Sequence, residues 1–254
     1  ALGAQVGVVT SAGPELDLGR ALKDVLISRL PASKSTTFEN VYTGRGRQQV
    51  IRSRAGQLGR EAIPRDWVAG VVHIGPVAQE CDPALVDGFK DAFVGVTPQG
   101  WMRAWDRTGR VRRIPWPEAD HVLPRADAVV LSDEDVDGDE TVIAEYAREA
   151  RCLAVTRGGA GCTVYSDGSI RHIGAPQADE VDPTGAGDVF AASFFYALAQ
   201  GHHAWIAARF ANCIAARSVT RRGLLSTPSD REVAHCRRTT LGNERDDADR
   251  VRAG

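Results

Sequence analysis

The residues that could do chemistry are concentrated in one glycine-rich segment, residues 181–190, which reads VDPTGAGDVF. Its small residues lead directly into an apolar stretch, Val189–Ala199, that is typical of a buried helix and that Gly201 could end. Backbone N–H groups at the start of a helix have no partner inside it and lie at its positive end, so they bind anions. The segment therefore predicts a phosphate or oxyanion site formed by the backbone of Gly185, Ala186 and Gly187.

Asp188 follows these residues and falls in the first turn of the expected helix. A carboxylate beside an anion site can accept a proton from an attacking hydroxyl group. Phosphoryl transfer needs little more from a protein than alignment of the reactants, a positive cradle and Mg²⁺. The alternative is a plain glycine-rich turn in which Asp188 only starts the helix, and a GxGD string by itself would favour that alternative.

The longer string, DPTGAGD followed by an apolar helix, resembles the signature of the ribokinase-like (PfkB) carbohydrate kinases. Three further segments resemble that family in the same order. Residues 128–135 resemble its strand with an Asn-x-x-Glu magnesium and phosphate motif. Residues 152–161 resemble its strand and nucleotide-contacting Thr-x-Gly turn, and residues 210–217 resemble the alanine-rich helix beside the adenine pocket. The match covers residues 1–235 and favours the catalytic interpretation of Asp188.

The resemblance implies an ATP-dependent kinase that acts on a small polyhydroxylated molecule, such as a sugar or a cyclitol like inositol. Asp188 would be the general base, and the 185–187 backbone would be the anion hole. The residues implied at the nucleotide are Thr156, Gly158, Ser132 and Asn212, the last of them near adenine. Those implied for Mg²⁺ are Asp135 and Glu134, and those implied for a monovalent cation such as K⁺ are Asp182 and Thr184.

The sequence departs from the family in two places. Ser132 and Asp135 stand where the magnesium motif has Asn and Glu, so the carboxylate is one methylene shorter but can still reach Mg²⁺ or its water shell. Family members also begin with a central strand, a substrate-binding Asp and a Gly-Gly segment, all upstream of the point where this chain starts. We therefore expect a kinase domain over residues 1–236 without that part. A non-catalytic ligand-binding relative or a truncated fragment is the alternative.

The elements around these motifs predict a doubly wound α/β fold with a mostly parallel sheet flanked by helices. The strand candidates are apolar on consecutive residues, as parallel strands covered on both faces are: Gln5–Thr10, Gly70–Gly75, Ala92–Thr97, Ala128–Leu131 and Cys152–Thr156. Leucines spaced by three and four predict a helix over Leu16–Leu30, and a similar pattern predicts another over Asp139–Ala150. Cys162–Ser166 and Ser169–Ile173 bracket Asp167-Gly168, which predicts a hairpin.

Residues 35–52 predict a second, more polar hairpin, at the point where the family carries a small β lid over its substrate and through which a homodimer could form. Its polar residues outnumber its aromatic ones; they are Thr36, Thr37, Glu39 and Asn40 against Phe38 and Tyr42.

Loops after two expected strands add the candidate substrate contacts Gln79, Glu80 and Gln99. This balance favours a sugar or cyclitol over a nucleoside, whose base would need a stacking slot, and a nucleoside kinase is the alternative. Arg45, Arg47 or Arg157 could serve a sugar phosphate.

Composition excludes little but adds four expectations. The 254 residues carry a net charge of -2, from 31 basic and 33 acidic residues, so no nucleic-acid partner is expected. The sequence has no apolar run of about 18 residues and no visible signal peptide, which predicts a cytoplasmic protein without a membrane partner. The cysteines lack a CxxC pair and are expected to be reduced thiols: Cys81, Cys152, Cys162, Cys213 and Cys236. Arg237–Gly254 is charged and almost free of apolar residues, which predicts a disordered tail.

Overall fold

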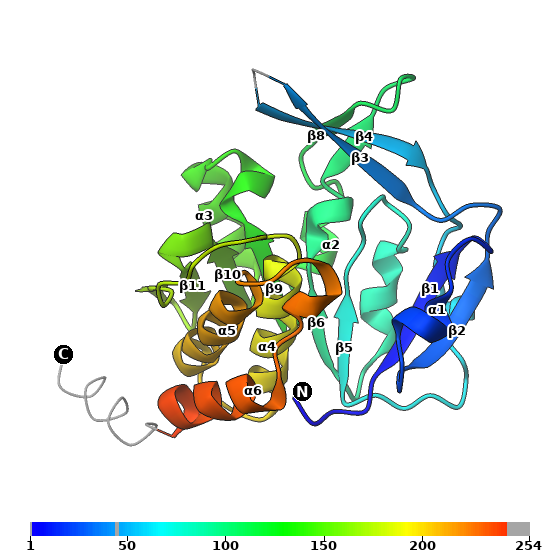
Figure 1. Ribbon diagram of the computed structural model, residues 1–254. Helices are drawn as coiled ribbons and strands as arrows, with labels where there is room; N and C mark the ends of the chain where they lie inside the picture. Colours follow the sequence, from blue (N-terminus) through cyan, green and yellow to red (C-terminus); the bar gives the residue numbers. More distant parts are fainter. Residues whose placement is uncertain (1, 44–45, 243–254) are drawn as a thin grey trace.

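The computed structural model describes residues 2–43 and 46–242. At its centre lies a six-stranded sheet with the order β12-β11-β10-β9-β6-β5 (Figure 1). Four strands pair in parallel: β5 (Val71–Ile74), β6 (Phe93–Val96), β9 (Ala128–Ser132) and β10 (Cys152–Thr156). An antiparallel hairpin, β11 (Cys162–Ser166) and β12 (Ser169–Ile173), completes one edge. The mostly parallel sheet and each of these strands were predicted, and they are confirmed.

Helices cover both faces of this sheet, which explains why its strands are apolar on consecutive residues. On one face lie α4 (Ala186–Ala199) and α5 (Ala204–Ser218), and on the other lie α2 (Ala119–Val122) and α3 (Glu140–Glu149). Alternate residues of a strand point to opposite faces. In β9, Ala128 and Val130 belong to the core with α4 and α5, whereas Val129 and Leu131 belong to the core with α2 and α3. The doubly wound α/β architecture is therefore confirmed.

A glycine in β6 lets α4 lie close to the sheet. A Cβ atom built at Gly95 would lie 2.3 Å from a ring atom of Phe195, which is fully buried in α4. A glycine inside a strand often marks such a close approach. This contact fixes α4 against β6 and so fixes the position of the glycine-rich segment from which α4 starts.

Smaller two-stranded sheets lie beside the main one (Figure 1). Their strands are β1 (Gly7–Ala12) parallel to β2 (Leu26–Pro31), β3 (Thr37–Thr43) antiparallel to β4 (Gly46–Ser53), and β7 (Arg103–Trp105) antiparallel to β8 (Val111–Arg113). The hairpin expected within residues 35–52 is thus present as β3 and β4. The remaining helices are α1 (Leu18–Ala21) and α6 (Asp230–Cys236), with short 3₁₀ turns at Arg60–Ala62, Pro83–Gly88, Pro98–Gly100, Asp133–Val136, Gly158–Ala160 and Gly223–Ser226.

The helix predicted for Leu16–Leu30 is wrong. Only Leu18–Ala21 is helical, and the chain enters strand β2 after Asp24, which has a left-handed φ of 62°. Leu26, expected on a buried helical face, has half of its surface exposed, at 50%. Leucines spaced by three and four are compatible with a helix, but pairing with β1, which is far away in sequence, decides the outcome.

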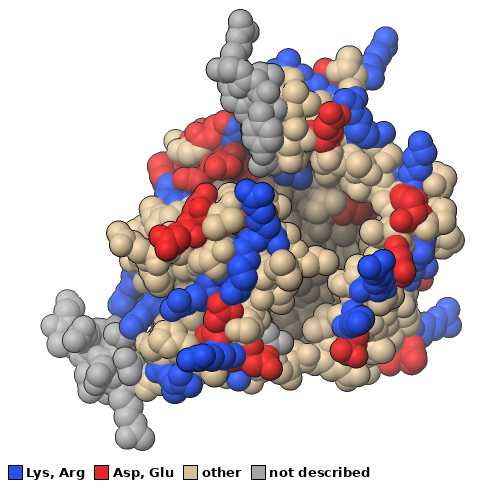
Figure 2. Space-filling model, viewed as in Figure 1, with Lys and Arg blue, Asp and Glu red and all other residues tan. Residues whose placement is uncertain are grey.

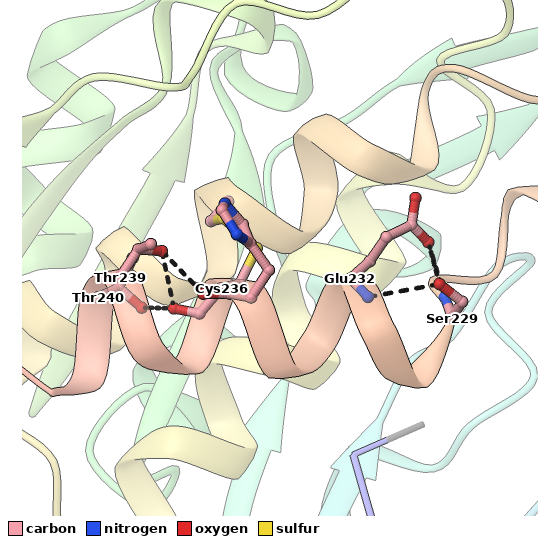
Figure 3. Close-up of a disulfide and its surroundings, with 7 residues drawn as sticks. Ser229, Glu232, Cys236, Thr239 and Thr240 are labelled. Atoms are coloured by element: carbon pink, nitrogen blue, oxygen red, sulfur yellow. Dashed lines mark hydrogen bonds between the residues drawn. A yellow bond between two sulfur atoms is a disulfide. The ribbon is translucent and has the colours of Figure 1, made fainter.

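The prediction of five reduced cysteines is wrong for two of them. Cys213 of α5 and Cys236 of α6 form a disulfide across 23 residues of sequence, with their Cα atoms 5.8 Å apart (Figure 3). Cys81, Cys152 and Cys162 are free, and burial raises the pKa of each thiol to about 12. The cytoplasmic location was expected together with reduced thiols, and this disulfide removes that support because disulfides are rare in a reducing compartment.

The prediction of a disordered tail from Arg237 onward is also wrong for its first residues. Arg237–Leu241 continues α6 as a π-helical turn. Arg237 donates to the Leu2 carbonyl oxygen at 2.7 Å. The Thr240 hydroxyl donates to the Cys236 carbonyl oxygen at 2.7 Å (Figure 3). Residues 243–254 lie outside the described residues. Among the described residues, no helix combines the length and apolar character that crossing a membrane requires.

Candidate active site

Asp188 lies in the first turn of α4, at the end of the glycine-rich segment. The residue before the helix, Gly185, has a left-handed φ of 83°, a conformation that glycine adopts without steric cost. The helix starts there because the Val189 N–H donates to the Gly185 carbonyl oxygen at 3.0 Å. The segment therefore folds as its composition predicted, and Asp188 is exposed at the start of the helix.

The backbone in front of Asp188 is open. A Cβ atom built at Gly187 would have no protein atom within 4 Å, so the space over this residue is free for a ligand. One of the three expected donors is already used, because the Ala186 N–H donates to the Pro183 carbonyl oxygen at 3.1 Å. The N–H groups of Gly187 and Asp188 lie in the first turn of the helix, where donors have no partner inside the helix. The anion hole at residues 185–187 stays a prediction.

The charge on Asp188 is set by two opposing effects. The surrounding protein removes hydration from the carboxylate, which raises its pKa above the usual range of an aspartic acid, although the side chain still reaches solvent. The positive charge of Arg103 offsets part of this rise. A carboxylate with a raised pKa is a better proton acceptor than an ordinary one, as a general base requires.

Sequence analysis did not single out Arg103. Its guanidinium carbon lies 5.4 Å from the centre of the Phe38 ring in β3, and its Nη1 donates to the Val77 carbonyl oxygen at 3.2 Å. Arg103 thus joins the lid hairpin to the loop after β5 while its charge acts on Asp188. The one available signal was its position shortly after the strand-end loop at Pro98–Gly100.

The loop after β5 uses one of its predicted substrate contacts for its own structure. The Glu80 carboxylate accepts hydrogen bonds from the backbone N–H groups of Val77, at 2.9 and 3.1 Å, and Ala78, at 2.6 Å. Its side chain is buried, with 9% of the residue exposed. Glu80 therefore holds the loop in shape, and a contact between Glu80 and the substrate stays a prediction.

The other two predicted substrate contacts link neighbouring loops. Gln79 has a left-handed φ of 58°, and its Nε2 donates to the Arg103 carbonyl oxygen at 2.5 Å. Gln99 donates from Nε2 to Asp135 Oδ1 at 3.1 Å. A cavity of about 530 Å³ borders Gln79 and Trp101, but its lining does not include Asp188. It is therefore separate from the glycine-rich segment.

The residues expected at Mg²⁺ form a capping box at the turn after β9. Asp135 Oδ2 accepts from the Ser132 N–H at 2.9 Å, and the Ser132 hydroxyl accepts from the Glu134 N–H at 3.2 Å. No group of three or more metal-binding side chains is arranged for a metal ion in the described part of the chain. These residues fit Mg²⁺ in its usual role with phosphates, where one or two carboxylates assist and water supplies other ligands.

The residues expected at the nucleotide lie at one end of β10 and on α5. Thr156 ends β10, and Gly158 follows with a left-handed φ of 54° in an exposed turn. Asn212 is buried, and its Nδ2 donates to the Ile173 carbonyl oxygen at 2.8 Å, at the end of β12. Its amide therefore ties α5 to the edge of the sheet. Arg157 is held by Glu140 at 2.8 Å and Asp133 at 3.7 Å.

The residues expected at a monovalent cation lie just before the glycines. Asp182 Oδ1 accepts from the Thr184 N–H at 3.0 Å, and Oδ2 accepts from the Gly223 N–H at 3.4 Å. Hydrogen bonds from Thr184 lower the pKa of Asp182, so it stays ionised. Its carboxylate therefore joins the glycine-rich segment to the turn at Gly223.

The polar residues of the lid partly satisfy one another. Glu39 forms an ion pair with Arg52 across the hairpin, and Gln49 donates to Asn40 at 3.4 Å. At its base, the Thr36 hydroxyl accepts from the Ala55 N–H at 3.0 Å, and the Thr37 hydroxyl donates to the Ser35 carbonyl oxygen at 3.2 Å. The side chains of Tyr42, Arg45 and Arg47 lie outside the described part. Figure 2 shows a hollow on the face between the helices and the N-terminal strands, below this hairpin.

Comparison with solved structures identifies the fold. A pyrophosphate-dependent kinase in the ribokinase family, solved with a pyrophosphate analog and myo-inositol, matches with a TM-score of 0.77 and 21% identity over 92% of this chain and 86% of that one. Ribokinase from Thermotoga maritima matches with a TM-score of 0.69 and 19% identity over 93% of this chain and 81% of that one. The ribokinase-like fold is therefore confirmed.

Comparison of sequences identifies the family. The family model of the pfkB family carbohydrate kinases matches residues 112–231. An inositol 3-kinase from Zea mays is 36% identical over 51% of this chain, and a second comes from Oryza sativa; the matches cover only 34% and 33% of those proteins, about a third of their length. A cytidine kinase from Thermococcus kodakarensis is 31% identical over 78% of this chain and 76% of its own length. The resemblance is confirmed, and the chain belongs to the PfkB family of carbohydrate kinases.

Proposed function

We propose that this chain is an ATP-dependent kinase that transfers the γ-phosphoryl group to a hydroxyl of a small sugar or a cyclitol such as inositol. The observation that carries the proposal is Asp188 in the first turn of α4, beside the open backbone of Gly187 and with a raised pKa. Phosphorylation of a hydroxyl group requires a proton acceptor and an anion site, and both lie at the start of this helix.

In the proposed mechanism, Asp188 accepts the proton of the acceptor hydroxyl as it attacks the phosphorus atom. The N–H groups of Gly187 and Asp188, at the positive end of α4, stabilise the negative charge on the transferred group. Ser132, Thr156 and Gly158 bind the donor. Mg²⁺ would neutralise the donor phosphates, and Asp135 and Glu134 would hold its water shell.

The acceptor class is supported by the relatives and by the lid. Two inositol 3-kinases match about half of this chain, and a fold neighbour was solved with myo-inositol. The hairpin carries more polar than aromatic side chains, which suits a polyhydroxylated acceptor. A specific observation also favours the alternative, a nucleoside kinase, because the relative that matches over most of its own length is a cytidine kinase.

The phosphoryl donor is a separate choice. ATP is supported by a fold neighbour, a putative ribokinase II from E. coli, that was solved with ATP and Mg²⁺. Pyrophosphate is the alternative, because other fold neighbours are named as pyrophosphate-dependent kinases. ATP carries a nucleoside and pyrophosphate does not. A contact between Asn212 and adenine would therefore matter only if ATP is the donor.

A two-way panel tests the proposal. The full chain is assayed with ATP or pyrophosphate against myo-inositol, fructose, ribose, cytidine and adenosine, and the phosphorylated product is detected by mass spectrometry. We expect the highest kcat/KM with ATP and a sugar or cyclitol. Preferred turnover of a nucleoside would overturn the acceptor class. Binding of a polyol without any turnover would favour the non-catalytic alternative.

Two further features belong to this proposal. K⁺ bound near Asp182 and Thr184 would neutralise charge beside the anion hole, so we expect the rate to rise when K⁺ replaces a large organic cation in the buffer.

A homodimer through the β3–β4 lid would pair two copies of the hairpin. Sedimentation analysis of the chain and of a variant without residues 38–51 measures that association.

A further inference from the structure

The two turns that would serve Mg²⁺ and the phosphoryl donor begin side by side. Strands β9 and β10 are parallel neighbours, and Ser132 at the end of β9 is in register with Thr156 at the end of β10. The metal-side turn, Asp133–Val136, follows the first strand, and the donor-side turn, Gly158–Ala160, follows the second. A side chain that bonds across this gap therefore sets how the two turns lie relative to each other.

Arg157 stands directly before the donor-side turn, and each nitrogen of its guanidinium has a partner. Nε donates to the Thr163 hydroxyl of β11 at 3.3 Å, Nη1 faces Asp133 Oδ2 at 3.7 Å, and Nη2 donates to Glu140 Oε1 at 2.8 Å. Asp133 belongs to the metal-side turn, and Glu140 begins α3. The guanidinium therefore ties the strand that leads to the donor-side turn to the metal-side turn and to the helix after it.

Asp133 passes this contact on to the cap of the metal-side turn. Its Oδ1 accepts from the Ser132 hydroxyl at 3.4 Å, and the same hydroxyl accepts from the Glu134 N–H at 3.2 Å. The Ser132 N–H in turn donates to Asp135 Oδ2 at 2.9 Å. Arg157 is thus connected through Asp133 and Ser132 to Asp135, the carboxylate expected at Mg²⁺, without touching it.

The charge of the metal-side segment explains why cations are needed to hold it. Residues 133–140 read DEDVDGDE, with six acidic side chains in eight positions. Like charges at such short separations repel one another. Arg113 of β8 supplies one cation, because it bonds the Glu134 carbonyl oxygen and pairs with Asp137. Arg157 supplies another, from the side of the donor-side turn.

We propose that Arg157 is a positioning residue of the transfer reaction, which locks the metal-side turn to the donor-side turn. This inference rests on the proposed roles of Asp135 at Mg²⁺ and Gly158 at the donor. The planar fork of an arginine holds several oxygen atoms in fixed directions at once, whereas the compact ammonium group of a lysine does not. The three partners of Arg157 therefore require an arginine and not only a positive charge.

A direct contact between Arg157 and the donor phosphates makes a different prediction. An arginine that bound the donor itself would contribute whether or not Glu140 was present. A positioning arginine acts through its carboxylate partners, so removing Glu140 costs nothing further once Arg157 is gone. A double-mutant cycle measures this difference, because residues that act as one unit are not additive.

Four variants form the test. Arg157→Met keeps the unbranched chain but removes the fork, and Arg157→Lys keeps the charge without it. Glu140→Ala removes the acceptor, and the double variant R157M/E140A completes the cycle. Arg148→Met is the matched control, because Arg148 is an exposed arginine of α3 that bonds within its own helix, to the Ala144 carbonyl oxygen at 3.2 Å.

Hydrogen exchange of the ligand-free protein, followed by mass spectrometry, reports the positioning without any turnover. In R157M the backbone amides of residues 132–140 should exchange about tenfold faster, as the loss of a hydrogen bond to a charged group predicts. E140A should move the same amides in the same direction, and the double variant should match R157M. R148M should exchange as the wild type does.

Steady-state rates with the preferred acceptor then connect the positioning to the reaction. In R157M the donor KM and the Mg²⁺ concentration for half-maximal rate should each rise about tenfold, while kcat at saturation changes little. R157K should lie between R157M and the wild type, and R148M should match the wild type in all three values. The double variant should again be no worse than R157M.

Unchanged exchange at residues 132–140 in folded R157M would overturn the inference. So would additive losses in R157M/E140A, which would assign Arg157 to the donor itself, or a lower kcat with an unmoved KM and Mg²⁺ titration. If R157M does not fold, R157K is judged by the same outcomes. Failure of the proposed function looks different, because the wild type itself would then not turn over with either donor.

Discussion

Gln99 donates a hydrogen bond from Nε2 to Oδ1 of Asp135 at 3.1 Å, which joins the loop after β6 to the turn after β9. Both loops follow parallel strands that pair with each other, so they meet at the carboxyl edge of the sheet. In open α/β sheets this edge is where ligands bind. A residue predicted at the acceptor is therefore bonded to a residue predicted at Mg²⁺, and the two predictions are physically coupled.

The first prediction concerns magnesium. Asp135→Ala should raise the Mg²⁺ concentration required for half-maximal rate, because the carboxylate that would hold the ion's water shell is lost. Gln99→Leu should shift the same titration in the same direction by less, because the carboxylate of Asp135 remains but is no longer held in place by the Gln99 amide. Both are compared by steady-state rates across a Mg²⁺ series. An unchanged titration in both variants would assign the ion to the donor phosphates and Glu134.

The second prediction concerns the base. Asp188→Asn keeps the size and hydrogen bonding of the side chain but removes the proton acceptor, so kcat should fall by roughly 10²- to 10⁴-fold. Affinity for ATP, measured by calorimetry, should be nearly unchanged. Asp91→Asn, at an exposed position before β6, is the control and should behave as the wild type. Activity of the Asp188 variant within about threefold of the wild type would contradict the role.

The third prediction is a pH dependence. Loss of hydration raises the pKa of Asp188 in the folded protein. A base with a raised pKa becomes protonated at a higher pH than an ordinary aspartic acid does, so kcat/KM should start to fall at a less acidic pH. A profile recorded in buffers of constant ionic strength measures this limb. The residual activity of Asp188→Asn should lack it, and persistence of the limb there would assign it to another group.

The fourth prediction concerns the anion hole. Gly187→Val fills the open space over the residue, so it should abolish most turnover while the protein stays folded. The control is Gly70→Val, whose Cβ also meets no protein atom within 4 Å but lies before β5. Melting curves and kcat are measured for both. Full turnover in the Gly187 variant would mean that the phosphoryl group binds elsewhere.

The fifth prediction concerns the disulfide between α5 and α6. Closing a loop of 23 residues restricts the unfolded chain, so its loss should reduce the free energy of unfolding by about 3 kcal/mol. Urea denaturation with and without dithiothreitol measures the loss, and the Cys213→Ser, Cys236→Ser double variant should reproduce it and no longer respond to the reductant. Cys81→Ser should keep the response. Equal stability in all forms would show that the bond does not form in solution.

The sequence by itself determined the strands of the main sheet, because their consecutive apolar residues reflect burial on both faces of that sheet. Strands β5, β6, β9 and β10 were predictable because consecutive apolar residues are required when helices cover both sides of a sheet. The glycine-rich segment was equally readable, because a left-handed residue such as Gly185 and a helix start are local properties of the backbone. Asp188 at that helix start follows from the same local rules.

Only the tertiary structure decided the features that depend on partners far away in sequence. Residues 26–31 became a strand because β1 is beside them, and Cys213 found Cys236 because α6 packs on α5. Two further departures are local contacts that no periodicity records: Glu80 is turned toward its own loop, and the Ala186 N–H is bonded to Pro183. Arg103 is one of several similar arginines in the sequence, and its contacts with Phe38 and Val77 exist only because the lid and the loop after β5 meet there. Local propensity fixes the conformation of a segment, whereas long-range packing selects which side chains share a site.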